Sequence, residues 1–185
     1  MTIQSSLLDD VEPEEIKPTQ IAWSHKELVS IAARWLNSKC GVVLPEFVTY
    51  EAEIADVLGF SRRNSYMIEV KVSRADFLRD KKKYFRYYEE MGVGNLRYYA
   101  CTRGLIGPLE VPDGWGLIYV SPNGNARQML APDRKKANYE AEKNILYSYA
   151  RRAVVKGHHA SIIRSMNQDK AILLGLKSGS TESTQ

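Results

Sequence analysis

The sequence predicts a single α/β domain, in which a mixed central sheet is flanked by helices and a basic helix follows at the C-terminal end. Apolar residues recur at helical spacing near the start of the chain, and short apolar segments typical of strands come after them. The chain has 185 residues, 44% of them hydrophobic, which is enough for one domain with a core but too few for two. We expect this domain over residues 23–166, between a flexible acidic arm at 1–22 and a flexible tail at 167–185.

The first helix is predicted over residues 24–39. Five apolar residues fall on one face of it: Leu28, Ile31, Ala32, Trp35 and Leu36. Ser24 and Glu27 have the Ser-x-x-Glu spacing of a capping box, in which each side chain binds the backbone amide of the other residue. This pair therefore marks the start of the helix.

Three strands are predicted next, over residues 42–50, 53–60 and 65–72. These segments are rich in β-branched and aromatic residues and are separated by polar or glycine-containing turns. The connection between the last two is short enough to form a hairpin loop.

A second helix is predicted over residues 73–91, with Ser73 as its N-cap and Asp76 at the capping-box position. Glycines at 92 and 94 would end it. One stripe of this helix would hold Phe77, Tyr84, Tyr88 and Met91.

The rest of the chain predicts strands over residues 96–102 and 114–121, a short strand over 126–130 and a basic helix or helix pair over about 134–165. The expected order of elements is therefore α-β-β-β-α-β-β-(β)-α.

The composition indicates the cellular compartment and the kind of binding partner. No stretch is apolar and long enough to span a bilayer, the N-terminus lacks a signal peptide, and the two cysteines fit no disulfide framework. We therefore expect a cytoplasmic protein, either bacterial or, if phage-encoded, in the host cytoplasm. Residues 1–22 hold five acidic residues and one lysine, so the rest of the chain carries a net charge of about +8. Such a basic body suits a polyanionic partner.

Two acidic residues, Asp56 and Glu69, lie inside apolar segments that otherwise resemble buried strands. A buried charge is normally paired or bound to a metal. If the two strands form a hairpin that pairs Val57 with Ile68, Asp56 faces Glu69 across the sheet. Lys71 shares the face of Glu69, because side chains alternate along a strand.

Facing carboxylates repel each other unless one is protonated or a hard cation lies between them. Mg²⁺ or Mn²⁺ suits such oxygen ligands, and one or two carboxylates with water and a substrate phosphate suffice for Mg²⁺. The ion would activate a water, and Lys71 would orient that water or stabilise the developing charge. The pattern thus fits metal-dependent phosphodiester cleavage; the alternative is a structural Glu–Lys ion pair beside a strand-end Asp.

Asp56, followed by Glu69-Val70-Lys71 between two predicted helices, resembles the PD-(D/E)XK nuclease superfamily over about residues 24–155. Ala55 stands where the superfamily's name has Pro. The segments IEVKVSRADFLRDKK and GWGLIYV further resemble a narrower group, the MmcB-type DNA-repair nucleases and related uncharacterised phage and bacterial proteins.

The resemblance implies a restriction-endonuclease-like α-β-β-β-α-β core. It also implies that Asp56, Glu69 and Lys71 are catalytic, with Asp56 and Glu69 as ligands of Mg²⁺ or Mn²⁺. Accessory roles are open for Glu27, Ser73 and Asp76, although capping of the two helices explains all three structurally.

A basic surface beside the predicted site is a candidate for phosphate contacts. The candidate DNA-binding residues are Arg62, Arg63, Arg74, Arg79, Lys81, Lys82, Lys83 and Arg86. A solvated helix face is the alternative for this charge run. Packing explains Tyr87, Tyr98 and Tyr99 more simply than stacking on bases does.

The function expected from these patterns is that of a metal-dependent nuclease acting on DNA in repair, recombination or phage DNA metabolism. Two alternatives stay open: a non-catalytic DNA- or protein-binding module on a nuclease scaffold, including a phage counter-defence protein, and an RNA-directed nuclease. No membrane partner is expected. The oligomeric state is open, with a homodimer among the choices.

Overall fold

The structure of the chain is a computed structural model that describes residues 23–49 and 54–157. The predicted acidic arm and the C-terminal tail lie outside these residues, as do the last part of the predicted basic helix and the loop-side ends of two predicted strands at 50–53. In chain order the elements are α1 (His25–Asn37), β1 (Val42–Pro45), β2 (Val57–Phe60), β3 (Ser65–Val70), α2 (Arg74–Asp80), α3 (Tyr84–Tyr87), the 3₁₀ helix η1 (Glu89–Met91), β4 (Leu96–Thr102), the 3₁₀ helix η2 (Pro108–Glu110), β5 (Gly116–Val120), β6 (Ala126–Leu130) and α4 (Tyr139–Val155).

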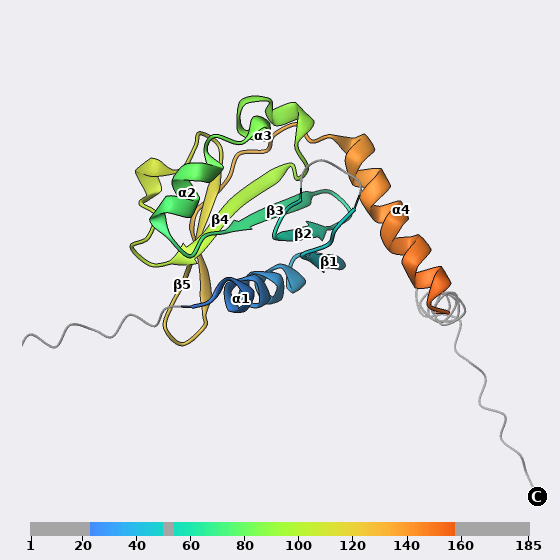
Figure 1. Ribbon diagram of the computed structural model, residues 1–185, viewed down its shortest axis with the longest axis horizontal. Coiled ribbons are helices and arrows are strands. Elements are labelled where there is room, and N and C mark those ends of the chain that lie inside the picture. The colour runs from blue at the N-terminus through green and yellow to red at the C-terminus, as the bar shows by residue number, and fades with distance from the viewer. Residues whose placement is uncertain (1–22, 50–53, 158–185) are drawn as a thin grey trace, which may run out of the picture.

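One mixed sheet contains the strands in the order β1-β2-β3-β4-β5-β6 (Figure 1). The first three strands pair antiparallel, β4 runs parallel to both β3 and β5, and β6 returns antiparallel beside β5. A parallel neighbour requires a crossover connection, which α2 and α3 provide between β3 and β4. The prediction of an α/β domain with a mixed sheet flanked by helices is confirmed. No helix in the described part of the chain is long and apolar enough to cross a membrane.

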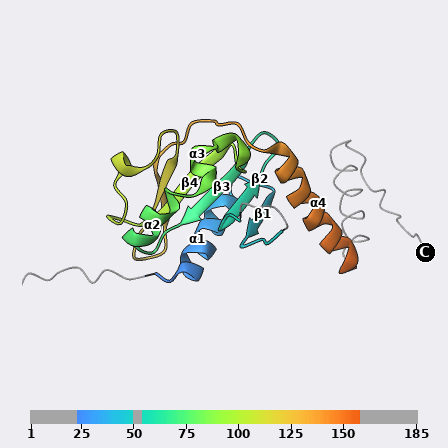
Figure 2. The same cartoon turned by 45° about the horizontal axis from the view of Figure 1, so that its top comes forward.

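Helices cover both faces of the sheet, with α1 on one face and α2 and α3 on the other (Figures 1 and 2). The apolar face of α1 packs with Ile68 and Val70 of β3 in one core. Met67 of β3 packs instead with Phe77 of α2 and Ile145 of α4 in a second core. Because side chains alternate along a strand, Glu69 shares the face of Met67 and is directed towards α2.

The predicted start of α1 is confirmed in atomic detail. Ser24 N donates to Glu27 Oε2 at 2.8 Å, and Glu27 N donates to Ser24 Oγ at 3.3 Å, which completes the capping box. The buried face of the helix consists of Leu28, Val29, Ile31, Ala32 and Leu36.

The predicted hairpin register is also confirmed, since β2 and β3 pair Val57 with Ile68 and Gly59 with Tyr66. β2 begins at Val57, so Asp56 lies directly before the first paired residue. Both strands are shorter than predicted, because pairing ends where the chain enters the loops around the site.

The prediction of one continuous helix over 73–91 is wrong. The chain leaves α2 after Asp80, and Lys83 has an extended backbone (φ −65°, ψ 143°) before α3 begins. In a continuous helix, Arg86 would lie about 9 Å along the axis from Asp80 and on another face. The break instead brings Arg86 Nε to 2.9 Å from Asp80 Oδ2. Ion pairing has therefore overridden helix propensity, and no Gly or Pro was available to signal the break.

A fully buried arginine holds the return of the chain into β4. Arg97 donates from Nε to Gly94 O at 2.8 Å and from Nη2 to the carbonyl oxygens of Glu89, Gly92 and Lys136 at 2.6–3.2 Å. These bonds fix the segment that carries η1 against the segment that leads to α4.

Gly94 is required at this return, and its replacement provides a test of the fold. Its φ is +80°, and an added Cβ would lie 2.6 Å from Met67 Cβ and 2.9 Å from Met67 N. We expect Gly94→Ala to lower the free energy of unfolding by about 2–4 kcal/mol, from the left-handed backbone and the overpacking together. Gly104, with φ +87° and no neighbour within 4 Å, is the matched control. Gly104→Ala should cost only about 1–2 kcal/mol in urea denaturation, and equal losses would contradict the packing.

Candidate functional site

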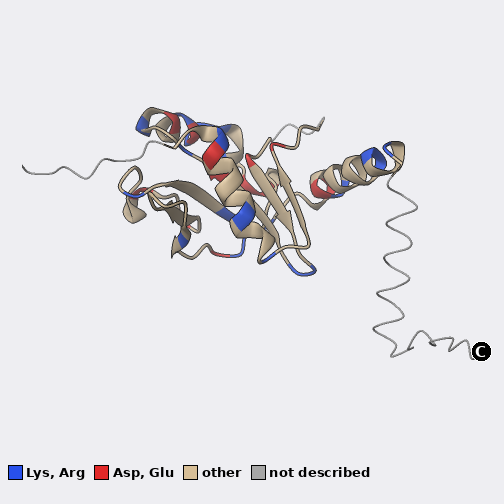
Figure 3. Cartoon of the chain, turned by 90° about the horizontal axis from the view of Figure 1, so that it is seen from below, with Lys and Arg blue, Asp and Glu red and all other residues tan. Residues whose placement is uncertain are grey.

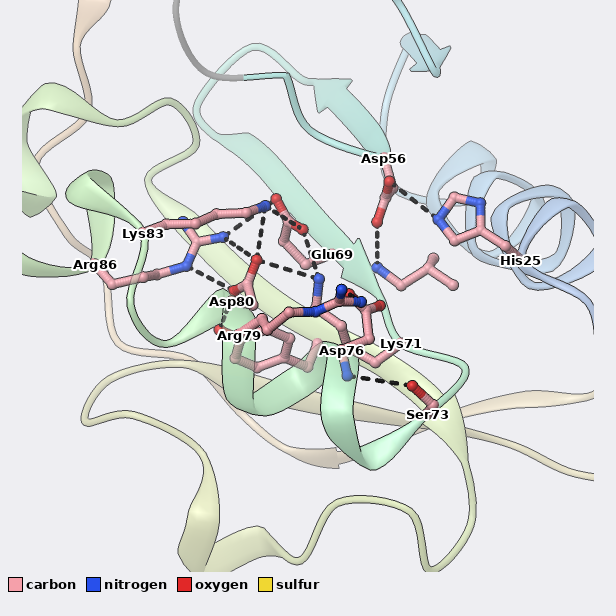
Figure 4. Close-up of polar contacts among 12 residues, drawn as sticks. His25, Asp56, Glu69, Lys71, Ser73, Asp76, Arg79, Asp80, Lys83 and Arg86 are labelled. Carbon is pink, nitrogen blue, oxygen red and sulfur yellow. Dashed lines mark hydrogen bonds and ion pairs between the residues drawn. The ribbon is translucent and has the colours of Figure 1, made fainter.

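Five charged side chains converge where β3 ends against α2 and α3 (Figure 4). This group, called here the ion cluster, consists of Glu69, Lys71, Asp80, Lys83 and Arg86. The residues Glu69, Lys71 and Asp80 are each 2–3% exposed, and the side chain of Arg86 is 4% exposed. The cluster thus buries two acids and two bases, with Lys83 at its half-exposed edge.

Glu69 is contacted by all three bases of the ion cluster. Lys71 Nζ lies 3.0 Å and Lys83 Nζ 3.4 Å from Glu69 Oε2. Arg86 Nη2 lies 3.2 Å from Glu69 Oε1, but this oxygen accepts no well-formed hydrogen bond from any described residue. One buried carboxylate oxygen therefore keeps acceptor capacity.

Asp80 has more complete partners than Glu69. Its Oδ1 lies 3.2 Å from Lys71 Nζ and 2.7 Å from Lys83 Nζ. Its Oδ2 accepts from Arg86 Nε at 2.9 Å and from the hydroxyl of Tyr99 at 2.6 Å. Asp80 therefore anchors all three bases and positions the ammonium group of Lys71 beside Glu69.

The pKa values of the two buried acids are shifted in opposite directions. Burial raises the pKa of Glu69, and the negative charges of Asp80 and Asp56 add to this rise, while Lys71 and Arg86 oppose it. Burial alone would also raise the pKa of Asp80, but hydrogen bonds and charge from Arg86, with hydrogen bonds from Lys83 and Tyr99, hold it well below its usual range. Opposite shifts in neighbouring acids are characteristic of functional sites, although structural ion networks produce them too.

An aromatic wall supports the ion cluster. Tyr99 stacks on Trp115 with ring centroids 4.7 Å apart, and the guanidinium carbon of Arg86 lies 4.6 Å from the Trp115 ring. Burial and the nearby Asp80 raise the pKa of Tyr99, so its hydroxyl stays protonated and remains a donor.

Asp56 lies at the edge of this arrangement with partners of its own. Its Oδ2 accepts from the backbone N–H of Val70 at 2.7 Å, and its Oδ1 lies 3.2 Å from His25 Nε2 (Figure 4). His25 Nδ1 is also 3.9 Å from Glu46 Oε1. The carboxylate thus joins β2 to β3 and to the start of α1, and its charge still reaches Glu69.

The accessory candidates have structural roles. The carboxylate of Glu27 is bound in its capping box, and Glu27 lines a hollow with Asn123 and Gly124 of the β5–β6 turn rather than the ion cluster. Ser73 Oγ accepts from Asp76 N at 3.2 Å, as expected for the N-cap of α2. The side chain of Asp76 contacts Arg79 at 3.7 Å.

The candidate DNA-binding residues do not form one surface. Lys83 and Arg86 were predicted on an exposed helix face, but both bind the acids of the ion cluster. The exposed face is wrong for Arg86, whose side chain is buried. Arg74 is held by both carboxylate oxygens of Glu110, which ties α2 to η2. Residues 62–63 occupy the β2–β3 turn, beyond Ser65, which itself lies about 14 Å along β3 from Glu69 at about 3.4 Å per residue.

Three candidate residues remain near the ion cluster and towards solvent. The side chain of Arg79 is 79% exposed, and Lys82 is exposed without an ion pair to any described residue. Lys81 places its Nζ 4.8 Å from the ring of Phe77.

A hollow of about 700 Å³ lies along α4 and not at the ion cluster. α4 lies within the predicted basic segment of about 134–165, but it carries acidic residues in its first turn and Arg152 in its last, so its charge is divided between its two ends (Figure 3). Arg151, Arg152 and Lys156 line the hollow. Thr49 directly precedes the undescribed residues 50–53, and Lys156 lies one residue before the end of the described range at 157, so we assign this hollow no function.

Sequence reasoning missed Asp80 and His25. Asp80 is the last residue of α2, where the helix dipole disfavours an acid. An acid at this position therefore indicates a basic partner, but only once the end of the helix is known. His25 had no local signal, because it meets Asp56 only through the packing of α1 on the sheet.

Comparisons with known proteins give one informative likeness. The chain matches no family model, and no curated protein resembles it significantly. A solved structure described as "SPO1766 protein of unknown function from Silicibacter pomeroyi" is similar, with a TM-score of 0.53 and 26% sequence identity over 74% of this chain and 94% of that one. The likeness supports the α/β fold. It carries no information on function, because the similar protein is itself described as one of unknown function.

Replacing Asp80 tests whether the ion cluster supports the fold. Asp80→Asn leaves three bases facing Glu69 alone, so we expect a loss of about 3–5 kcal/mol in urea denaturation at pH 7. The pKa of Asp80 is lower in the folded state, so its stabilisation is full above the ordinary Asp pKa of about 3.9 and is lost as pH falls below it. The mutant should therefore show a shallower loss of stability below about pH 4.

Asp76→Asn is the matched control, on the same helix and with a weak, solvent-screened partner. It should change the free energy of unfolding by less than about 1 kcal/mol. Two results would contradict a stabilising role for Asp80. One is a similar loss of stability in both variants, and the other is a wild-type dependence of stability on pH below about pH 4 in Asp80→Asn.

Proposed function

We propose that this chain is a metal-dependent nuclease that hydrolyses phosphodiester bonds of DNA. The observation that carries the proposal is the β2–β3 register, which pairs Val57 with Ile68 and so puts Asp56, the residue before Val57, beside the end of β3 that carries Glu69. The negative charge of Asp56 contributes to the raised pKa of Glu69, so the two carboxylates act on each other.

The order of elements supports the proposal. An antiparallel β1–β2–β3 unit after α1, then α2 and α3, then β4 parallel to β3, agrees with the α-β-β-β-α-β core of the PD-(D/E)XK superfamily. We therefore propose the restriction-endonuclease-like fold as well, with Asp56, Glu69 and Lys71 at the positions that the superfamily uses.

The donor atoms fit a hard divalent cation. Among the residues that the structure describes, no three His, Cys, Asp or Glu side chains converge on one point. Mg²⁺ nevertheless needs only one or two carboxylates when substrate phosphate and water complete its shell. Glu69 Oε1, buried without a hydrogen bond, and the carboxylate of Asp56, whose side chain is 23% exposed, are the oxygens that would hold it.

The bound ion would lower the pKa of a water and neutralise charge on the scissile phosphate. The protein's own contribution comes from Lys71, whose ammonium group is held by Glu69 and Asp80 at 3.0 and 3.2 Å. A preorganised cation in a dry site stabilises charge that develops during attack on the phosphate. Lys83, at the half-exposed edge, is placed to meet a phosphate that approaches from solvent.

A second function, nucleic-acid or protein binding without catalysis, is favoured by one observation. The ion cluster holds three bases against two acids, so its own charge attracts a phosphate more than a metal ion. A divalent ion at Glu69 would have to compete with Arg86, 3.2 Å away. The two functions differ in whether phosphodiester bonds are cut.

A cleavage assay that compares the wild type with Lys71→Ala distinguishes the nuclease from the binding module. Single-stranded, duplex and branched DNA, with RNA as the alternative substrate, are incubated with Mg²⁺ or Mn²⁺ below the melting temperature of both proteins. We expect the wild type to cut DNA and Lys71→Ala to cut at least a hundredfold more slowly, since such a group is worth roughly 3 kcal/mol.

Lys39→Ala is the control, because Lys39 is exposed at the end of α1, the helix that covers the other face of the sheet. It should keep the wild-type rate. Cleavage that persists in EDTA, or a rate that Lys71→Ala does not change, rules out the proposed chemistry. A wild type that binds DNA but cuts nothing supports the binding module.

A further inference from the structure

Three tyrosines are exposed on the segment that closes the ion cluster. Tyr84, Tyr87 and Tyr88 are 55%, 70% and 50% exposed, and Met91 beside them is 46% exposed. Packing, which explained Tyr87 at the sequence level, does not account for it. The buried Tyr98 and Tyr99 do pack in the core.

The side chains of residues 83–88 point in two directions. Lys83 and Arg86 point inward to Glu69 and Asp80. Residues i and i+3 share one side of a helical turn, so Tyr84 and Tyr87 lie on the same side of α3. Tyr88 directly follows the helix, and its ring contacts that of Tyr84. The ring centroids of Tyr84 and Tyr88 are 4.6 Å apart at an interplanar angle of 31°, so the two rings form a tilted pair. Only the width of α3 separates these exposed rings from the acids Glu69 and Asp80. The distance is therefore about one helix diameter, roughly 10 Å.

The charge around the tyrosines suits a polyanion. Arg79 and Lys82 are exposed on the approach from α2. Of the two acids that follow, Glu89 is neutralised by Lys135 at 2.6 Å, which leaves Glu90 towards solvent. Exposed rings beside exposed cations suit nucleic acid, because its bases can stack on the rings while its phosphates contact the cations.

We propose that Tyr84, Tyr87 and Tyr88 form a stacking platform for unpaired bases, so that the substrate of the proposed nuclease is single-stranded nucleic acid or a single-stranded region of it. This inference rests on the proposed function. Every base has a π-face that an exposed ring can cover, whereas in a duplex those faces are already stacked. Exposed bases on the platform would place the neighbouring phosphates, about one or two nucleotides away, at the ion cluster.

The test measures binding without cleavage. Fluorescence anisotropy in EDTA compares a single-stranded DNA oligonucleotide with the same sequence as a duplex. We expect Tyr84→Ala combined with Tyr88→Ala to weaken single-strand binding on the order of tenfold or more, and duplex binding by less than about twofold. The matching Phe substitutions at both positions keep the rings and should keep the single-strand affinity.

Tyr147→Ala is the control for losing an exposed tyrosine, since Tyr147 is 62% exposed on α4. It should leave the ratio of single-strand to duplex affinity unchanged. The inference is overturned by equal losses on both substrates, by no loss, by a loss that the Phe variant shares, or by a wild type that binds neither substrate. Failure of the nuclease proposal is distinguishable, because it shows as absent cleavage while the single-strand preference in EDTA persists.

Discussion

The burial of two carboxylates under three bases is the constraint on which the rest of this structure depends. Removing Glu69 and Asp80 from water is expensive, and only close pairing with Lys71, Lys83 and Arg86 compensates for it. The chain satisfies that pairing by breaking what would otherwise be one helix between Asp80 and Tyr84. Local propensity is weak compared with an unpaired buried charge, so the break follows from electrostatics.

The break has consequences for function. It directs Arg86 inward against Trp115 and turns the tyrosines of α3 outward, so one short segment both closes the site and presents an aromatic surface. Asp80 then holds Lys71 next to Glu69, and Arg97 fixes the return into β4 behind it. Asp56 joins from the neighbouring strand through the amide of Val70. The three proposed catalytic residues thus lie at the ends of β2 and β3, and ion pairs support them from one side.

Much of this was predictable from the sequence. Periodicity and the capping box located α1, alternation located the strands, and the turn between β2 and β3 gave the correct register from Val57–Ile68 to Phe60–Ser65, next to Asp56 and Glu69. The broken helix was not predictable, because it depends on Asp80 meeting Arg86 through a contact that propensity does not describe. His25 reaches Asp56 only when α1 docks on the sheet. Which lysines and arginines stay unpaired near the ion cluster is likewise decided by folding, which pairs Arg74 with Glu110 and Arg86 with Asp80 and separates the β2–β3 turn from the site.

The most direct test of the account is whether Asp56 and Glu69 hold a divalent ion together. Urea denaturation of the wild type, Asp56→Asn and Glu46→Gln is measured in EDTA and in saturating Mn²⁺; Glu46 also approaches His25 but is assigned no metal. At an ion concentration of about 100 times Kd, linkage predicts a gain of about 2.7 kcal/mol for the wild type and Glu46→Gln, and little for Asp56→Asn. No gain in the wild type, or the same gain in Asp56→Asn, would contradict the metal site and leave the ion cluster as architecture.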